Sequence, residues 1–226
     1  MKSLIGDYRV LDITDEKGYL CGKILGDLGA DVIKIEPPGG DAARNIGPFY
    51  HDVHHPERSL FWFAYNTSKR GITLNIESTN GRELFSRLAM TADFIIESFS
   101  PGYMDSLGLG YSALSKINPK LTMTSITPFG QSGPCKDWKA SDIVIMGMGG
   151  LMNMSGGPDR EPLRFSVEQS YPQAGTQAAM ASMIAHYHRQ IIGEGQHIDV
   201  SMQECITQTL WIMPILWYVN EFISKR

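Results

Sequence analysis

The stretch from Ile24 to Asp41 constrains the fold more than any other part of the chain. Its first residues continue an apolar helical face, and Gly29 follows at the position where helices commonly end with a positive φ. The run Val-Ile-Lys-Ile-Glu at residues 32–36 is typical of a short strand that is buried on both faces. The two prolines and two glycines at residues 37–40 cannot continue a ladder of backbone hydrogen bonds, so the strand must end at Glu36.

The same alternation of strand, loop and helix recurs along the chain. Strands are predicted at residues 9–13, 32–36, 72–76, 94–97, 121–126 and 196–200, and helices at 59–65, 78–90 and 111–117. This order is typical of a doubly wound α/β fold, an open, mostly parallel sheet with helices on both faces. In such sheets ligands bind at the carboxyl ends of the strands, so we expect one ligand site along loops 36–41, 97–102 and 128–134.

The later part of the chain is rich in small and apolar residues. A Met-rich helix is predicted at residues 142–154 and a long small-residue helix at 174–192. The apolar run at 206–223 is barely long enough to span a bilayer and contains polar residues, so we expect a buried or partner-facing helix there. We therefore predict a large domain over residues 1–200. Residues 201–226 are expected to lead towards an absent second half or a partner chain, as in a molecule cut short or completed by another chain.

Composition and simple motifs exclude several classes of function. The formal net charge of −4 gives no broad attraction to nucleic acid or to an anionic membrane. The three cysteines show no CxxC spacing, which favours a reducing cytoplasm over a disulfide framework or a zinc site. His51, His54 and His55 lack a carboxylate or thiol at ligand spacing, so no metal is expected. No GxGxxG follows a strand and no phosphate loop occurs, so NAD is not expected either.

Six short motifs follow one another in a fixed order. They are LGADVIKIEPPGGD at residues 28–41, NTSKR at 66–70, SPG at 100–102, LGLGY at 107–111, FGQSGP at 129–134 and GEGQHIDVS at 193–201. Together they closely resemble the N-terminal part of the class III coenzyme A transferases, the CaiB/BaiF family, which also contains the α-methylacyl-CoA racemases. The resemblance runs from Gly6 to about residue 220.

This resemblance implies a Rossmann-like large domain that binds coenzyme A, with an acyl-CoA and a carboxylic acid as substrates. It also implies a dimer of interlocked chains, either a homodimer or a heteromer with a related CoA-transferase chain. This chain would then supply about the first half of a family member.

The position of the family nucleophile is altered in this chain. In the family's transferases an aspartate attacks the acyl-CoA thioester, and it stands four residues before a glycine that opens the small-residue helix. Counting back from Gly175, the matching position holds Tyr171, and the nearest carboxylate is Glu168. The racemases use a His-Asp pair after the FGQxGP loop; here Asp142 is retained but Ser141 stands where the histidine belongs.

Contacts to coenzyme A are also implied by the resemblance. The candidate binding residues are Glu36, Pro37, Asn66, Lys69, Arg70, Leu74, Ser98, Phe99, Lys139 and Asp142. Phe99 matches the residue on the adenine side, with Ser98 in place of the usual asparagine, and Lys139 matches a lysine near the phosphates. Pro37 and Ser106 replace common basic residues, so weaker phosphate binding is expected.

Three functions remain open on these grounds. The leading hypothesis is a CoA-transferase that moves coenzyme A between an acyl-CoA thioester and a carboxylic acid, as a subunit without the usual aspartate nucleophile. The second is a non-catalytic CoA-thioester-binding or vestigial protein. The third is an acyl-CoA racemase or isomerase.

Overall fold

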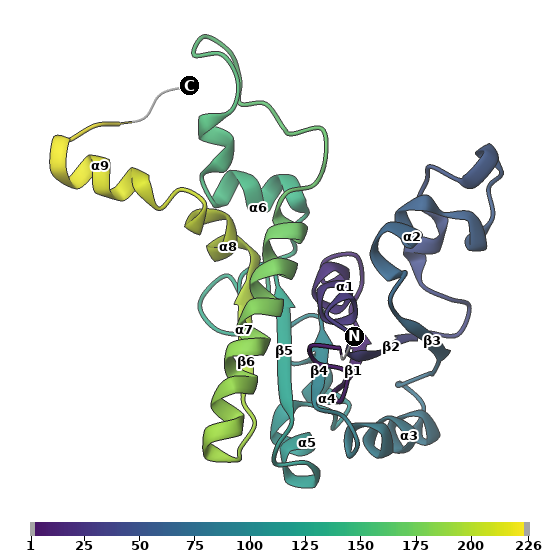
Figure 1. The fold of residues 1–226 in the computed structure, drawn as a ribbon. Helices are drawn as coiled ribbons and strands as arrows, with labels where there is room; N and C mark the ends of the chain where they lie inside the picture. Colours follow the sequence, from purple (N-terminus) through teal and green to yellow (C-terminus); the bar gives the residue numbers. More distant parts are fainter. Residues whose placement is uncertain (1–2, 224–226) are drawn as a thin grey trace.

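The computed structural model describes residues 3–223, and its centre is one open sheet (Figure 1). The strands are β1 (Arg9–Ile13), β2 (Asp31–Glu36), β3 (Arg70–Thr73), β4 (Phe94–Glu97), β5 (Thr122–Thr127) and β6 (His197–Ser201). They lie in the order β3-β2-β1-β4-β5-β6, and each neighbouring pair is parallel. The predicted α/β fold with a parallel sheet is therefore confirmed.

Helices cover both faces of this sheet, as predicted. On one face lie α1 (Tyr19–Asp27) and α7 (Ser170–Ile192), and on the other α3 (Thr79–Ala89), α4 (Tyr103–Ser106) and α5 (Tyr111–Ile117). The structure also contains α2 (Leu60–Asn66), α6 (Asp142–Met148), α8 (Met202–Gln208), α9 (Ile212–Asn220) and 3-10 turns at 42–45, 50–52, 56–58 and 151–154. Because neighbouring residues of a strand point to opposite faces, Val10 packs in the core under α1 and α7, whereas Leu11 packs in the core under α3 and α5.

The long helix α7 begins earlier than its sequence pattern predicts. It starts at Ser170 rather than Ala174 because the carboxylate of Asp142 accepts hydrogen bonds from the backbone N–H groups of Gln169 and Ser170, both at 2.8 Å. A carboxylate at this position satisfies amides that have no partner within the helix and interacts favourably with the helix dipole. Tyr171 therefore lies in the first turn of α7.

Two other elements are shorter than predicted. The expected strand 72–76 ends at Thr73, because the Asn75 side chain accepts the N–H of Glu77 and forms a turn. The expected helix 142–154 breaks where Gly150 adopts a φ of +87°, a conformation that favours glycine, and a 3-10 turn follows. The side chain of Ser78 caps helix α3 by accepting the N–H of Gly81, and Leu84 on this helix is 46% exposed.

The apolar run at 206–223 forms two short pieces instead of one helix. Helix α8 ends at Gln208, and α9 begins at Ile212 after a turn of the chain. Among residues 3–223, no helix combines the length and the apolar character needed to cross a bilayer. Residues 1–2 and 224–226, which belong to the two predicted domain segments, lie outside the described residues.

A cluster of buried charges joins β1, β2 and the segment before β3. The carboxylate of Asp12 lies 2.7 Å from the ammonium of Lys69 and 3.6 Å from that of Lys34, and all three side chains are at most 2% exposed. Burial alone would raise the pKa of Asp12, but the two ammonium groups together hold it below its usual value. The carboxylate of Asp12 is therefore ionised, and the ammonium groups of Lys34 and Lys69 compensate its charge.

We predict that Lys69→Met lowers the free energy of unfolding by about 3–5 kcal/mol, because it leaves Asp12 short of a cation in the interior. Arg70→Met is the matched control, since the ion pair of Arg70 with Asp31 is solvent-exposed and contributes about 0–1 kcal/mol. Urea unfolding of both variants measures the difference.

The stabilisation by the Asp12 ion pairs depends on pH. Because the pKa of Asp12 is lower in the folded state than in the unfolded state, the stabilisation is present above the unfolded value and is lost as the pH falls through the folded value. The difference in the free energy of unfolding between Lys69→Met and the wild type should therefore become smaller in acid. Equal losses for the two variants at neutral pH would contradict the assignment.

Candidate functional site

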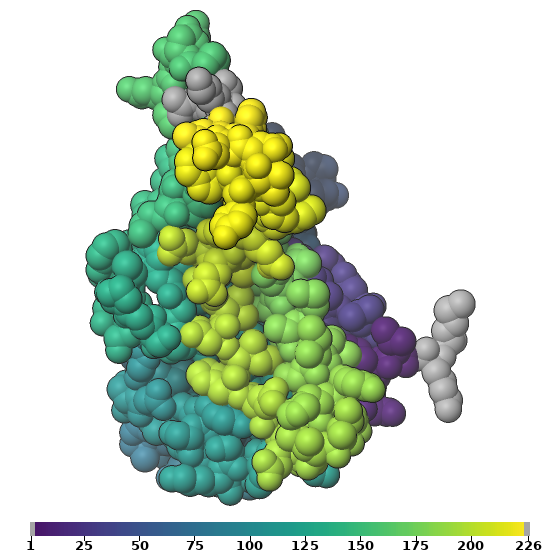
Figure 2. Space-filling model, turned by 90° about the vertical axis from the view of Figure 1, so that its left-hand side faces the viewer, coloured from purple at the N-terminus to yellow at the C-terminus, as the bar shows by residue number. Residues whose placement is uncertain are grey.

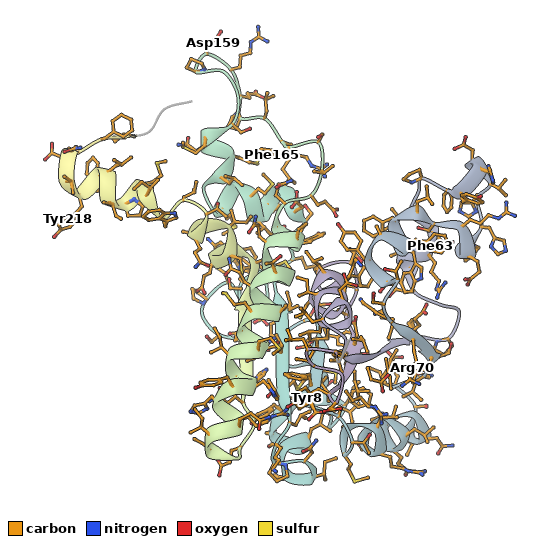
Figure 3. All side chains as sticks on the ribbon, viewed as in Figure 1. Tyr8, Phe63, Arg70, Asp159, Phe165 and Tyr218 are labelled. Carbon is orange, nitrogen blue, oxygen red and sulfur yellow. The ribbon has the colours of Figure 1, made fainter. Side chains whose placement is uncertain are left out.

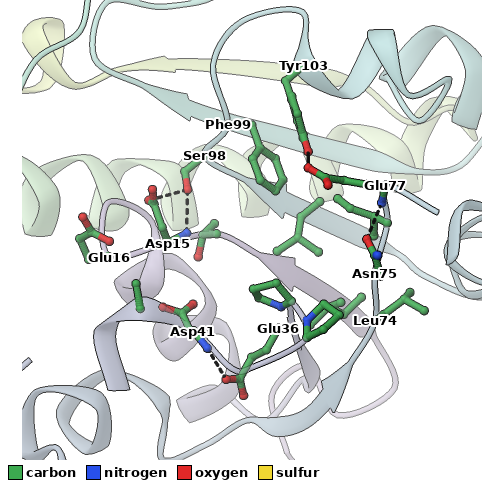
Figure 4. Close-up of a pocket in the computed structure, with 17 residues that line it drawn as sticks. Asp15, Glu16, Glu36, Asp41, Leu74, Asn75, Glu77, Ser98, Phe99 and Tyr103 are labelled. Atoms are coloured by element: carbon green, nitrogen blue, oxygen red, sulfur yellow. Dashed lines mark hydrogen bonds between the residues drawn. The ribbon is translucent and has the colours of Figure 1, made fainter. Parts of the chain in front are cut away.

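A pocket of about 620 Å³ opens at the carboxyl ends of the strands on one side of the sheet (Figure 4). Its lining comes from four loops: Ile13, Thr14, Asp15 and Glu16 after β1; Ile35, Glu36, Pro37, Pro38, Asp41 and Ala42 at β2; Leu74, Asn75, Ile76 and Glu77 after β3; and Ser98, Phe99 and Tyr103 after β4. The volume is in the range of small-molecule sites. Two of the three predicted loops contribute, whereas loop 128–134 does not line this pocket.

One wall of the pocket is the end of β2 with the turn that follows it. The guanidinium of Arg44 donates to Glu36 through Nε at 2.6 Å and Nη2 at 2.8 Å, and Glu36 also accepts the N–H of Asp41 at 3.0 Å. Burial alone would raise the pKa of Glu36, but these hydrogen bonds hold it below its usual value. Glu36 is therefore an ionised anchor of the wall that carries Pro37.

Sequence reasoning missed Arg44. The signal was the Pro-Pro-Gly-Gly turn itself, which reverses the chain and returns it to Glu36, so that a basic residue shortly after the turn was placed to pair with that carboxylate. Arg44 also stacks on the ring of Trp62, with its guanidinium carbon 4.2 Å from the ring centroid.

The opposite wall is the loop after β4. The rings of Phe99 and Tyr103 lie 4.8 Å apart between centroids, and the Tyr103 hydroxyl donates to Glu77 at 2.9 Å. The Ser98 hydroxyl donates to the Asp15 carboxylate and accepts the Asp15 N–H, both at 2.8 Å. These contacts tie the aromatic wall to the loops after β1 and β3 (Figure 4).

The pocket lining is acidic. It contains the carboxylates of Asp15, Glu16, Glu36, Asp41 and Glu77 and no lysine, arginine or histidine. Three of these carboxylates form an ion pair: Asp15 with Lys17, Glu36 with Arg44 and Asp41 with Lys34. The interior of the pocket therefore suits the neutral parts of a ligand better than its phosphates.

The candidate catalytic residues Glu168 and Tyr171 lie together at the start of α7. Burial raises the pKa of Glu168, and the negative charges of Asp142 and Glu16 raise it further. Burial also raises the pKa of the Tyr171 phenol to about 12, again with contributions from Glu168, Glu16 and Asp142. Glu16, which lines the pocket, is one of the charges that act on both groups, but neither Glu168 nor Tyr171 lines the pocket itself.

The carboxylate of Asp142 holds the backbone at the start of α7. One of its oxygens accepts the N–H groups of Gln169 and Ser170 and the Ser170 hydroxyl, each at 2.8 Å. Its other oxygen is buried without a hydrogen-bond partner among the described residues. Asp142 therefore fixes the segment that carries Glu168 and Tyr171, and it offers a free acceptor there.

The structure brings only some of the predicted coenzyme A contacts together. Glu36, Pro37, Leu74, Ser98 and Phe99 line the pocket. Asp142, at the start of α6, does not, and neither do the other four, Asn66, Lys69, Arg70 and Lys139.

Those four residues have other surroundings. Lys69 is buried against Asp12, and Arg70 pairs with Asp31 at the opposite, amino end of β2. Asn66 ends α2 and donates to the Trp62 carbonyl at 3.2 Å, and Lys139 is exposed after loop 128–134.

Other polar groups do not assemble into a metal site. Among residues 3–223, no group of three or more His, Cys, Asp or Glu side chains is arranged to hold a metal ion. His51, His54 and His55 are exposed, as expected of a solvated loop. Cys21, which the sequence assigns to packing, is buried in the core under α7, and the three cysteines are free.

Comparison with known proteins identifies the family. The model of "CoA-transferase family III" matches residues 5–222. The chain is 39% identical over 218 residues to "Succinyl-CoA:(R)-benzylsuccinate CoA-transferase subunit BbsE" of Thauera aromatica, covering 96% of this chain and 53% of the relative. It is 36% identical over 224 residues to "Succinyl-CoA--D-citramalate CoA-transferase" of Chloroflexus aurantiacus, covering 98% and 55%.

The fold agrees with this relationship. The crystal structure of a CAIB/BAIF family protein from Brucella suis matches with a TM-score of 0.92 and 39% identity, covering 99% of this chain and 59% of that one. The chain spans about half the length of the curated relatives it matches. The resemblance seen in the sequence motifs is thereby confirmed, and the chain belongs to CoA-transferase family III.

Proposed function

We propose that this chain supplies the coenzyme A-binding part of a family III CoA-transferase, which moves coenzyme A between an acyl-CoA thioester and a carboxylic acid. The observation that carries this proposal is the pocket at the carboxyl ends of β1, β2 and β4, in a chain whose relatives are named CoA-transferases. The binding unit is residues 1–200, and the three free thiols agree with a cytoplasmic setting.

The pocket fits the neutral parts of coenzyme A. Phe99 and Tyr103 offer an aromatic wall for the adenine, and Leu74 and Pro37 offer apolar contacts. The phosphates stay at the rim, because the interior is acidic and Pro37 supplies no positive charge. We propose Lys139 as a phosphate contact because it matches a family lysine near the phosphates and is exposed, with no hydrogen bond or ion pair among the described contacts. This division explains the expected weak phosphate binding.

The start of α7 is where the thioester would lie. A tyrosine whose pKa is about 12 is almost entirely neutral at physiological pH, so Tyr171 cannot act as the attacking anion. The carboxylate of Glu168 has the required chemistry: it would attack the thioester carbonyl carbon, the C–S bond would break and the CoA thiolate would leave. Its raised pKa makes it more often neutral than an ordinary glutamate, which slows that attack.

We therefore propose that the chain is a subunit without its own nucleophile, paired with a related chain that carries the aspartate. One relative is named a subunit. Exposed apolar side chains on α7 and on or near α9 also support a partner: Ile184, Tyr187 and Ile191 of α7 and Trp211 and Tyr218 near or on α9 are 62–91% exposed. Figure 2 shows this side of the molecule, and Tyr218 projects away from the sheet in Figure 3.

A second candidate function is the binding of CoA thioesters without catalysis. It is favoured by the same replacement at Tyr171, and it does not require a partner with the nucleophile.

We predict that Tyr171→Asp raises exchange of labelled coenzyme A into acyl-CoA at least about tenfold in a complex whose partner chain has lost its own aspartate. Glu168→Gln should leave wild-type exchange within about twofold, because Glu168 is not the nucleophile. Loss of exchange in Glu168→Gln by about a hundredfold would identify Glu168 as the attacking group. Binding of coenzyme A with no exchange in any complex would support the binding protein.

We predict that Phe99→Ala weakens coenzyme A binding by about 1–2 kcal/mol, measured by calorimetry, since it removes an aromatic wall of the pocket. Phe63→Ala is the matched control, because Phe63 is 41% exposed on α2 and does not line the pocket (Figure 3). Equal affinities of the two variants would place the ligand elsewhere.

We predict that Asp142→Ala speeds hydrogen exchange of the Gln169 and Ser170 amides by about tenfold or more, because both lose their acceptor. Asp137→Ala, at an exposed position of the same connection, should leave these amides unchanged. Unchanged exchange in both variants would show that Asp142 does not hold the start of α7.

A further inference from the structure

A second polar cluster lies beneath the pocket, between the ends of β4 and β5 and the start of β6. Its members are Glu97, Ser125 and His197, which we call the relay residues. The Ser125 hydroxyl oxygen lies 2.9 Å from Nε2 of His197, and the same hydroxyl hydrogen-bonds the carboxyl of Glu97. Glu97 and Ser125 are 3% and 2% exposed and sit opposite one another in the sheet.

The surroundings shield Glu97 and Ser125 from bulk water, whereas His197 at the start of β6 is exposed. A cavity of about 20 Å³, large enough for one water molecule, is lined by the relay residues and by Asp105, Tyr111 and others. The Tyr111 ring stacks on the His197 imidazole, with 5.4 Å between centroids and an 18° angle between planes. The hydrogen bonds of Glu97 and Ser125 therefore lie where little solvent can replace them.

The relay residues connect to the pocket through one backbone hydrogen bond. The Oε2 atom of Glu97 accepts the N–H of Phe99 at 2.7 Å. Phe99 presents its ring to the pocket, so the carboxyl of Glu97 helps to set where that ring stands. This makes Glu97 a positioning residue for the aromatic wall.

The charge of Glu97 changes near neutral pH. Burial raises its pKa to about 7, hydrogen bonds from Ser125 and the Phe99 N–H oppose the rise, and the nearby charges of Asp15 and Asp105 add to it. Burial lowers the pKa of His197, an effect that the charges of Asp199 and Asp105 partly oppose. The pKa of the imidazole therefore lies below that of an ordinary histidine, whereas the pKa of the Glu97 carboxyl lies above that of an ordinary glutamate.

Ser125 has only one hydroxyl hydrogen, so the hydrogen bonds that it makes with Glu97 and with His197 depend on each other. An ionised Glu97 can only accept, so Ser125 donates to it and must receive a hydrogen from Nε2 of His197. A neutral Glu97 can donate its proton to the Ser125 oxygen, which frees the hydroxyl hydrogen for a bare Nε2 and leaves the imidazole proton on Nδ1. Each charge state of Glu97 thus selects one tautomer of His197.

We propose that Glu97, Ser125 and His197 form a hydrogen-bond relay that reverses direction when Glu97 gains or loses its proton, and that this reversal tunes the hold of Glu97 on the Phe99 amide. A neutral carboxyl is a weaker acceptor than a carboxylate, so Phe99 is held less firmly in acid. The consequence for ligand affinity rests on the proposed coenzyme A function, whereas the relay itself does not.

The relay is tested without ligand, by the ¹⁵N NMR shifts of the His197 imidazole at about pH 8.5 and about pH 6. In the wild type we expect the proton on Nε2 at the higher pH and on Nδ1 at the lower. Glu97→Gln imitates the neutral carboxyl, since its amide donates to Ser125 and its oxygen accepts from Phe99, so the proton should stay on Nδ1 at both. Ser125→Ala should abolish the pH-dependent change. One tautomer in the wild type at both pH values overturns the relay.

The effect on the pocket is tested by calorimetry with coenzyme A at the same two pH values. We expect the wild-type affinity to fall about fivefold more than that of Glu97→Gln between the higher and the lower pH. Comparing the two proteins removes the titration of the ligand's own phosphate. Identical pH dependence overturns the link to Phe99. Absence of binding in both proteins overturns the proposed function, and the tautomer result then decides the relay by itself.

Discussion

The buried pairing of Asp12 with two lysines is the constraint on which the pocket depends. Besides Lys34 and Lys69, the carboxylate of Asp12 accepts the backbone N–H and the hydroxyl of Thr14, at 3.0 and 2.7 Å. Lys34 also donates to the Thr14 carbonyl. The loop after β1, which lines the pocket, is therefore held by charges in the interior as well as by the hydrogen bonds of Asp15 with Ser98. A buried ion pair of this kind defines a geometry more than it adds stability.

The sequence was sufficient for the fold because each strand carried its own local signal. The β-branched run at 32–36, the cap at Ser78 and the positive φ at Gly29 were all predictable from short-range rules. Lys69 was different. Its partner Asp12 is 57 residues away, and nothing within its own segment distinguishes a buried ion pair from a charge that faces a ligand.

The candidate site shows the same limit. The pocket edge was predictable from topology, since parallel strands place their carboxyl ends together. The start of α7 was not, because it depends on Asp142, a residue 28 positions from Ser170 that accepts three hydrogen bonds there. Helix propensity begins the helix at Ala174, and only the long-range acceptor extends it to include Tyr171.

The electrostatics at the start of α7 give the replacement of the family aspartate a physical meaning. Besides burial, the charges of Asp142 and Glu16 raise the pKa of Glu168, and all three carboxylates raise the pKa of the Tyr171 phenol. An aspartate at position 171 would add a fourth carboxyl to this group at a half-buried position, and the neighbouring negative charges would raise its pKa. A phenol avoids that cost while it keeps a hydroxyl for hydrogen bonding. A neutral phenol at position 171 therefore agrees with the proposed subunit that lacks its own nucleophile.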